Sequence, residues 1–293
     1  MLREIITPQT QDYTVKIPLE YLNTNVEILV LPFSENKANT PLYQGKTSDL
    51  RQLLKSYPVG DRNSSEIDQQ ISLLRIELAW HEIGMVLYTQ QRLDEALVAY
   101  RQLLGINSED ESSWNMIGYI LEEQGKLDEA LVTYRKLLEI NPKHEDAWHS
   151  MGCVIEKQGN LKKSLVAYRK QLKINPKCDM AWHSIGCVLK KQGKLDEALT
   201  AYHKQLKINP EHELAWNSIG IVFGKQGKLD EAMAAFRKQL DINPKHDEAW
   251  NNMGYALEKQ GKLGKALDAY RKALKIEPKN EYAKNNLDRL LKK

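Results

Sequence analysis

Tryptophan recurs in this chain at a fixed interval. The six tryptophans stand at positions 80, 114, 148, 182, 216 and 250, so the spacing between neighbours never changes. In the third unit, Trp148 is followed by Gly152, Ser164 and Tyr168, and the other units keep the same offsets with a glycine, a small residue and an aromatic residue. A fixed period of roughly 20–50 residues is typical of repeat architectures. From the first tryptophan onward, the chain is therefore expected to form an array of similar units rather than a globule.

Each unit predicts two amphipathic helices. In the third unit, one stripe with helical spacing starts at Trp148, and a second runs through residues 161–172. Gly159 is expected to end the first helix, and a proline closes five of the six units. Gly152 should let the paired helices approach closely, with the tryptophan as a core residue that fills the wider gap beside it. One pair cannot bury its apolar stripes alone, whereas stacked pairs share a continuous core.

The pattern W-x2-[IM]-G-x2-[LIF], followed by A-x3-[YF] and then P, resembles the tetratricopeptide repeat over residues 77–280. This resemblance implies a mainly α fold, a right-handed α-solenoid of six helix pairs. We expect a lead-in helix and the solenoid in residues 64–280, and a C-terminal capping helix in 281–293, where Lys284 replaces the tryptophan. The repeats are expected to start near residues 77, 111, 145, 179, 213 and 247.

Residues 1–63 lack the repeat and are expected to form a separate module. The run Val26–Leu31 is rich in β-branched residues and predicts one strand of a small β-hairpin, followed by a polar linker. Residues 16–31 and 49–57 resemble small bacterial antitoxin-like proteins, which implies a homodimer formed through residues 13–31. The alternative is a hairpin that shields the exposed edge of the first repeat.

Composition excludes several classes of protein. The 42 basic and 39 acidic residues leave a net charge of +3, which argues against a nucleic-acid partner. No apolar run approaches the roughly 18 residues of a membrane helix, and the N-terminal segment does not form a secretory signal. An odd number of cysteines without a CxxC motif argues against a disulfide framework. We therefore expect a cytoplasmic protein with no membrane contact.

The first helix of each repeat is expected to line a concave face, with the side chains one and five residues after each tryptophan pointing into it. Amide side chains there could bind an extended peptide backbone, and lysines further along could hold carboxylates. The alternative is an ordinary solvated helix edge. The candidate groove residues are His81, Asn115, Tyr119, His149, His183, Lys190, Lys191, Asn217, Lys225, Asn251 and Tyr255.

His149 and Cys153, and likewise His183 and Cys187, are four residues apart on successive first helices. Imidazole and thiolate ligands suggest zinc as an alternative, but the helix spacing makes such a site tight, and the repeat period alone produces the pairing. The sequence has no P-loop, GxSxG, HExxH or dinucleotide-binding motif, so neither catalytic residues nor a cofactor are expected.

These observations predict a non-catalytic scaffold that binds a protein or an extended peptide. Two alternatives of other classes remain: an antitoxin-like regulator whose N-terminal module dimerises while the solenoid recruits a partner, and a protein that binds metal or nucleic acid.

Overall fold

A computed structural model describes residues 64–292. Within that range the backbone forms thirteen helices joined by short turns. The predicted β-hairpin, the antitoxin-like segments and the predicted dimer segment 13–31 all lie outside the described residues. The helices are α2 (Ser64–Thr89), α3 (Leu93–Ile106), α4 (Glu111–Glu123), α5 (Leu127–Ile140), α6 (Glu145–Lys157), α7 (Leu161–Ile174), α8 (Asp179–Lys191), α9 (Leu195–Ile208), α10 (Glu213–Lys225), α11 (Leu229–Ile242), α12 (Asp247–Lys259), α13 (Leu263–Ile276) and α14 (Glu281–Leu291).

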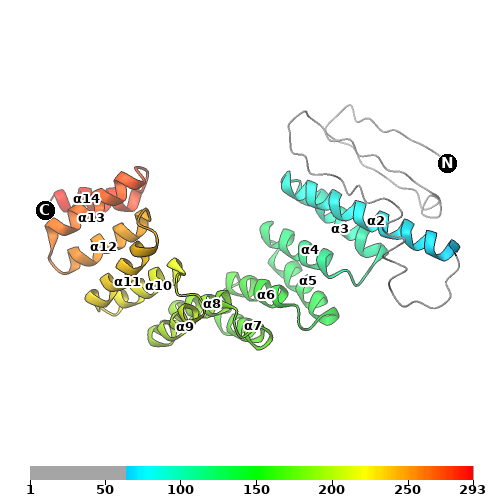
Figure 1. The fold of residues 1–293 in the computed structure, drawn as a ribbon, viewed down its shortest axis with the longest axis horizontal. Coiled ribbons are helices and arrows are strands. Elements are labelled where there is room, and N and C mark those ends of the chain that lie inside the picture. The colour runs from blue at the N-terminus through cyan, green and yellow to red at the C-terminus, as the bar shows by residue number, and fades with distance from the viewer. Residues whose placement is uncertain (1–63, 293) are drawn as a thin grey trace, which may run out of the picture. The chain divides into compact units, whose positions relative to one another are not determined.

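The chain divides into two compact units between Asp110 and Glu111. In the first unit, α2 packs against α3, whose Ala96, Tyr100 and Leu103 are buried. The second unit contains five helix pairs followed by the single helix α14 (Figure 1). All six helix pairs predicted from the period are therefore formed.

Contacts in the second unit run along the array. Each first helix packs on the second helix of its own pair, and each second helix packs on the first helix of the next pair. Successive first helices also touch, as α8 and α10 do, and α14 packs against α13 and α12. Each pair thus buries its apolar stripes against its neighbours, which is the defining property of a solenoid.

The glycine in the middle of each first helix faces the aromatic ring of the paired second helix. A Cβ atom built on Gly152 would lie 2.5 Å from Cε1 of Tyr168, and one on Gly186 would lie 2.5 Å from Cε1 of Tyr202. Both tyrosine rings are buried. Only glycine leaves room for a ring at this place, so the spacing between glycine and aromatic residue sets how closely the two helices approach.

The tryptophans do not occupy the core position predicted for them. All six are half-buried, whereas the aromatic residue of the second helix is buried in every repeat. The indole N–H of Trp148 donates to the carbonyl oxygen of Pro142 at 3.0 Å, and the ammonium group of Lys204 lies 4.2 Å from the ring centre of Trp182. The tryptophans therefore pack against the edge of the core, and Trp148 also bonds the loop that enters its own repeat, while the tyrosine supplies the fully buried ring.

The turn within each pair uses the predicted glycine. Gly159 has φ +81°, a left-handed conformation that glycine adopts without steric cost. Its N–H donates to the carbonyl of Glu156 at 2.9 Å, and the N–H of Asn160 donates to that of Ile155 at 3.0 Å, which ends helix α6. In the first repeat Gln91 takes the same place with φ +61°.

None of the described helices combines the length and the apolar character needed to cross a membrane.

Candidate functional site

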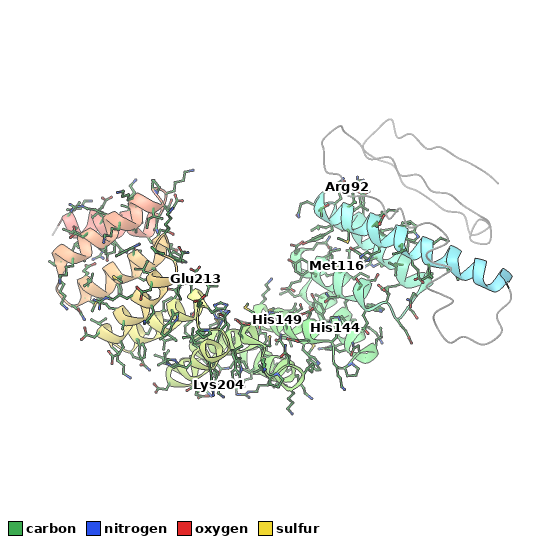
Figure 2. The ribbon with its side chains drawn as sticks, viewed as in Figure 1. Arg92, Met116, His144, His149, Lys204 and Glu213 are labelled. Carbon is green, nitrogen blue, oxygen red and sulfur yellow. The ribbon has the colours of Figure 1, made fainter. Side chains whose placement is uncertain are left out.

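Five helices of the second unit present the predicted groove side chains. We call the side chains one and five residues after each tryptophan on α4, α6, α8, α10 and α12 the first-helix face. Asn115, His149, His183, Asn217 and Asn251 are half-buried on it; His149 is labelled on α6 in Figure 2. Tyr119 and Tyr255 are 44% and 48% exposed. In the first unit, His81 packs edge-on against Tyr100 with ring centres 5.9 Å apart.

The two histidines of the first-helix face belong to polar clusters. Nδ1 of His149 lies 3.1 Å from Oε1 of Gln171, and its Nε2 lies 3.6 Å from Sγ of Cys153. In the next repeat the corresponding distances, from His183 to Gln205 and Cys187, are 3.1 and 3.4 Å. The hydrogen bond with Cys153 raises the pKa of His149 against the effect of burial. Both rings are thus held in place by their neighbours.

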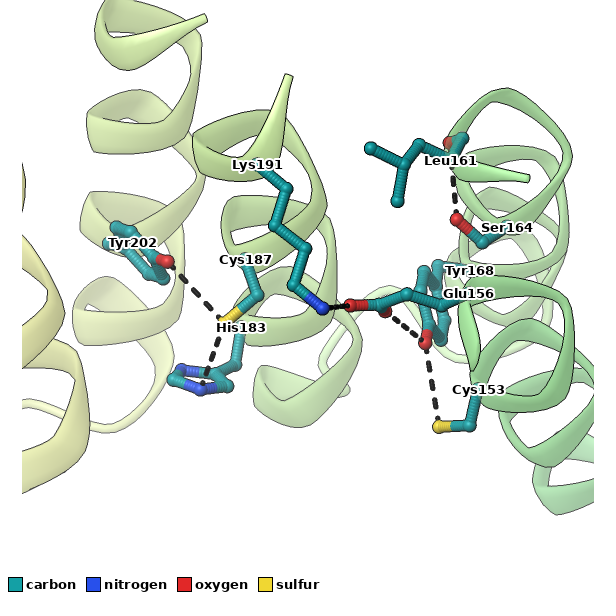
Figure 3. Close-up of polar contacts among 9 residues, drawn as sticks. All are labelled: Cys153, Glu156, Leu161, Ser164, Tyr168, His183, Cys187, Lys191 and Tyr202. Carbon is teal, nitrogen blue, oxygen red and sulfur yellow. Dashed lines mark hydrogen bonds and ion pairs between the residues drawn. The ribbon is translucent and has the colours of Figure 1, made fainter. Parts of the chain in front are cut away.

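The zinc alternative has no support in this geometry. Among residues 64–292, no group of three or more histidine, cysteine or acidic side chains could hold a metal ion. Each thiol instead contacts its own histidine. Each also accepts a hydrogen bond from a buried tyrosine hydroxyl at 3.4 Å, from Tyr168 to Cys153 and from Tyr202 to Cys187 (Figure 3). The two His–Cys pairs are therefore separate, one in the third repeat and one in the fourth.

Asn217 and Asn251, on the first helices of the fifth and sixth repeats, use only one end of their side-chain amides within the chain. Oδ1 of Asn217 accepts from Nδ2 of Asn252 at 3.1 Å, and Oδ1 of Asn251 accepts from Nδ2 of Asn286 at 3.0 Å. The carbonyl of each amide is thus used between repeats, while its NH₂ group has no partner in the described part of the chain. The sequence interpretation overlooked Asn252 and Asn286, although these two asparagines are themselves separated by one repeat period.

Ion pairs join the ends of successive first helices. Nζ of Lys157 lies 2.9 Å from Oε1 of Glu122, and Nζ of Lys191 lies 2.7 Å from Oε1 of Glu156 (Figure 3). The carboxylate stands eight residues after its tryptophan and the lysine nine residues after the next one, so we call this series the inter-repeat ladder. Glu156 raises the pKa of Lys191 through its hydrogen bond.

The inter-repeat ladder is interrupted in the fourth and fifth repeats. Lys190 stands where the previous two repeats have glutamate, so the same geometry sets Lys225 opposite another lysine instead of a carboxylate. Gly224 then takes the glutamate place that would face Lys259. At the C-terminal end, Glu258 is again paired, with Nη2 of Arg289 at 2.7 Å from its Oε2. The predicted lysine trio is thus divided: Lys191 is neutralised, whereas Lys190 and Lys225 have no carboxylate partner among the described residues.

Comparison with known proteins identifies the repeat. Residues 105–293 match the family described as the Cilia and flagella-associated protein 70 C-terminal domain, and residues 78–110 match the tetratricopeptide repeat. None of the curated protein sequences matches this chain.

Several solved structures share the fold. YrrB, described as a TPR protein with an unusual peptide-binding site, is 24% identical over 64% of this chain and 96% of its own, with a TM-score of 0.51. The type IV pilus biogenesis factor PilW is 17% identical over 72% of this chain and 98% of its own, with a TM-score of 0.64. PilF of Pseudomonas aeruginosa is 23% identical over 63% and 84%, with a TM-score of 0.56.

The structural likenesses establish the fold alone, because all three identities are low. The family match is more specific, since it extends over more than half of the chain and contains the glycine–tyrosine contacts and the inter-repeat ladder. The chain is a tetratricopeptide-repeat protein and belongs to the family of the Cilia and flagella-associated protein 70 C-terminal domain.

Proposed function

We propose that this protein is a non-catalytic scaffold that binds an extended, acidic segment of a protein partner on its first-helix face and on the adjoining lysines of the inter-repeat ladder. The observation that carries the proposal is the interruption of the inter-repeat ladder. Lys190 and Lys225 stand on adjacent first helices without a carboxylate from the described chain, so a carboxylate from a ligand can take that place.

The asparagines beside this interruption suit a peptide backbone. The side-chain carbonyl oxygens of Asn217 and Asn251 already accept hydrogen bonds within the chain. Their NH₂ groups can therefore donate to main-chain carbonyl groups of a bound peptide. The ring of Tyr255, with the ammonium group of Lys259 at 5.4 Å from its centre, adds an exposed apolar surface next to a positive charge. Side-chain amide donors, an aromatic surface and unpaired cations together favour an extended acidic peptide over a neutral or basic one.

Two structural neighbours agree with a protein partner. YrrB is described as having a peptide-binding site, and Cut9 is part of a hetero-tetramer with Hcn1. Cut9–Hcn1 is 14% identical over 83% of this chain and 52% of its own, with a TM-score of 0.59. These descriptions support binding of a polypeptide, while the acidic character of the ligand rests on Lys190 and Lys225.

A library of random decapeptides tests the proposal. The full chain is expected to select sequences enriched in aspartate and glutamate. The double variant Lys190→Glu, Lys225→Glu should weaken binding of a selected peptide by about tenfold or more, because two attractive pairs become repulsive. Fluorescence polarisation with the labelled peptide measures the affinity, which should also fall as the salt concentration rises.

The matched control is Lys177→Glu, Lys245→Glu, which makes the same change in net charge on exposed loops between repeats. This control should bind the peptide like the original chain. Selection of peptides without an acidic bias, or equal loss of affinity in the two double variants, would contradict the proposed role of Lys190 and Lys225 in binding. Absence of any selected peptide would count against peptide binding itself.

A further inference from the structure

The thiol of Cys187 lies in a cluster that can take up its proton. Its Sγ is 3.4 Å from Nε2 of His183, and the hydroxyl of Tyr202 donates to the same sulfur at 3.4 Å (Figure 3). All three cysteines are free thiols, and Cys187 is only partly buried. A thiol paired with an imidazole and a hydroxyl donor is the arrangement that turns a cysteine into a nucleophile.

Gln205 fixes the tautomer of the imidazole. Its Oε1 lies 3.1 Å from Nδ1 of His183, and because a carbonyl oxygen only accepts, the ring proton is on Nδ1. The lone pair of Nε2 then points toward the thiol. The Gln205 side chain is 0% exposed, and its Nε2 has no partner among the described residues. In the second repeat the same position holds the apolar Leu137. In the fourth repeat this buried glutamine supplies the acceptor that orients His183.

Lys190 adds a positive charge one turn along the helix from Cys187. Its ammonium group favours the thiolate electrostatically and is not neutralised by a carboxylate of the described chain. Burial opposes ionisation, but the hydrogen bond and charge of His183, together with Tyr202 and Lys190, lower the pKa of Cys187 below its ordinary value. The ring of His212 stacks on His183 with centres 6.0 Å apart.

The other two cysteines lack this combination. Cys153 has the same histidine and tyrosine contacts, but Glu156 stands where Cys187 has Lys190, and the hydroxyl of Tyr168 also donates to Glu156, at 3.0 Å. Cys153 therefore lacks the lysine that stands one turn along the helix from Cys187. Burial raises the pKa of Cys178 to about 11, and Gln171 donates to its sulfur at 3.2 Å. Cys187 is thus the activated thiol, and Cys153 and Cys178 serve as reference thiols in the same chain.

We propose that Cys187 is an oxidation site at which hydrogen peroxide converts the thiol selectively to a sulfenic acid. The thiolate sulfur attacks one peroxide oxygen, so that an S–O bond forms while the O–O bond breaks. The sulfur is oxidised, the peroxide is reduced, and the departing hydroxide takes the proton from the His183 imidazolium and leaves as water. The neutral His183 is restored. The assignment does not rest on the proposed peptide binding, although Lys190 takes part in both sites.

Trapping experiments on the full, reduced chain test the assignment. The chain is treated at pH 7 with limiting hydrogen peroxide in the presence of dimedone, which captures sulfenic acids. Lowering the pKa of a thiol by one unit raises its thiolate fraction about tenfold but lowers the nucleophilicity of the thiolate about threefold. The net gain in reaction rate is therefore about threefold for each pKa unit. Cys187 should therefore be labelled about tenfold or more faster than Cys178, and faster than Cys153. Both Cys178 and Cys187 occur in the tryptic peptide 178–190, so fragment ions must locate the label.

Two variants identify the groups responsible. His183→Asn, a residue that the fold accepts at the same place in Asn217 and Asn251, should slow labelling of Cys187 by about threefold or more. Lys190→Glu, which copies the surroundings of Cys153, should also slow it, whereas the loop control Lys177→Glu should not. Equal labelling of the three cysteines in the original chain would overturn the proposal without any variant, and so would undiminished labelling of Cys187 in His183→Asn.

Discussion

Replacing Tyr202 with alanine is expected to lower the free energy of unfolding by about 3–5 kcal/mol, the range for removing a large buried aromatic side chain. The tyrosine is 0% exposed and packs in the core shared by α8, α9 and α10. Its hydroxyl also donates to the sulfur of Cys187, so the deletion leaves both a cavity and a lost hydrogen bond. Guanidinium unfolding followed by circular dichroism measures the change.

Tyr282→Ala is the control for this prediction. Tyr282 is 76% exposed on α14, and its replacement should change stability by about 0.5 kcal/mol or less. A loss for Tyr202→Ala as small as that for Tyr282→Ala would mean that the tyrosine of the second helix does not carry the core. A larger loss of unfolding free energy for Trp182→Ala than for Tyr202→Ala would show that the half-buried tryptophan contributes more to the core than the tyrosine does.

The change Gly186→Ala should destabilise the protein by about 1–3 kcal/mol, the usual cost of overpacking a core. The new methyl carbon would lie 2.5 Å from Cε1 of Tyr202, whose buried ring has no room to withdraw. Gly224→Ala should have the opposite sign. Nothing lies within 4 Å of a Cβ atom there, and alanine favours the helix over glycine by about 0.5–1 kcal/mol. Thermal unfolding of both variants decides the sign of each effect.

Combining the two changes at one contact isolates the steric term. In a chain that already carries Tyr202→Ala, the added change Gly186→Ala should lose most of its cost, because the ring that it meets is gone. An undiminished cost in that background would show that some other constraint acts on Gly186.

Most of the helical framework could be predicted from residue spacing. The constant repeat period, the two apolar stripes in each unit and the glycine at Gly159 all act locally, through the i, i+3, i+4 geometry of a helix and the left-handed turn that follows it. Such features depend on residues close together in the chain. They predicted six helix pairs, and the structure has them.

Which aromatic residue forms the core could not be predicted in this way. Trp148 and Tyr168 both lie on apolar stripes, and both positions recur with the same period. Only the close approach of paired helices decides between them, because the ring that faces Gly152 is enclosed on all sides while the tryptophan stays beside the loop. Burial is a property of the packed array and not of the period.

The differences between similar residues of the candidate site also arise from the packing of successive helices. Lys190 and Lys191 are neighbours in the chain, yet Lys191 reaches Glu156 on the previous first helix while Lys190 has no carboxylate partner in residues 64–292. Likewise, Cys153 and Cys187 share the histidine contact and differ in the residue one helical turn further on, Glu156 against Lys190. The residues and their order were visible in the chain, but charges one repeat apart neutralise each other only where packing of successive helices brings them within contact distance.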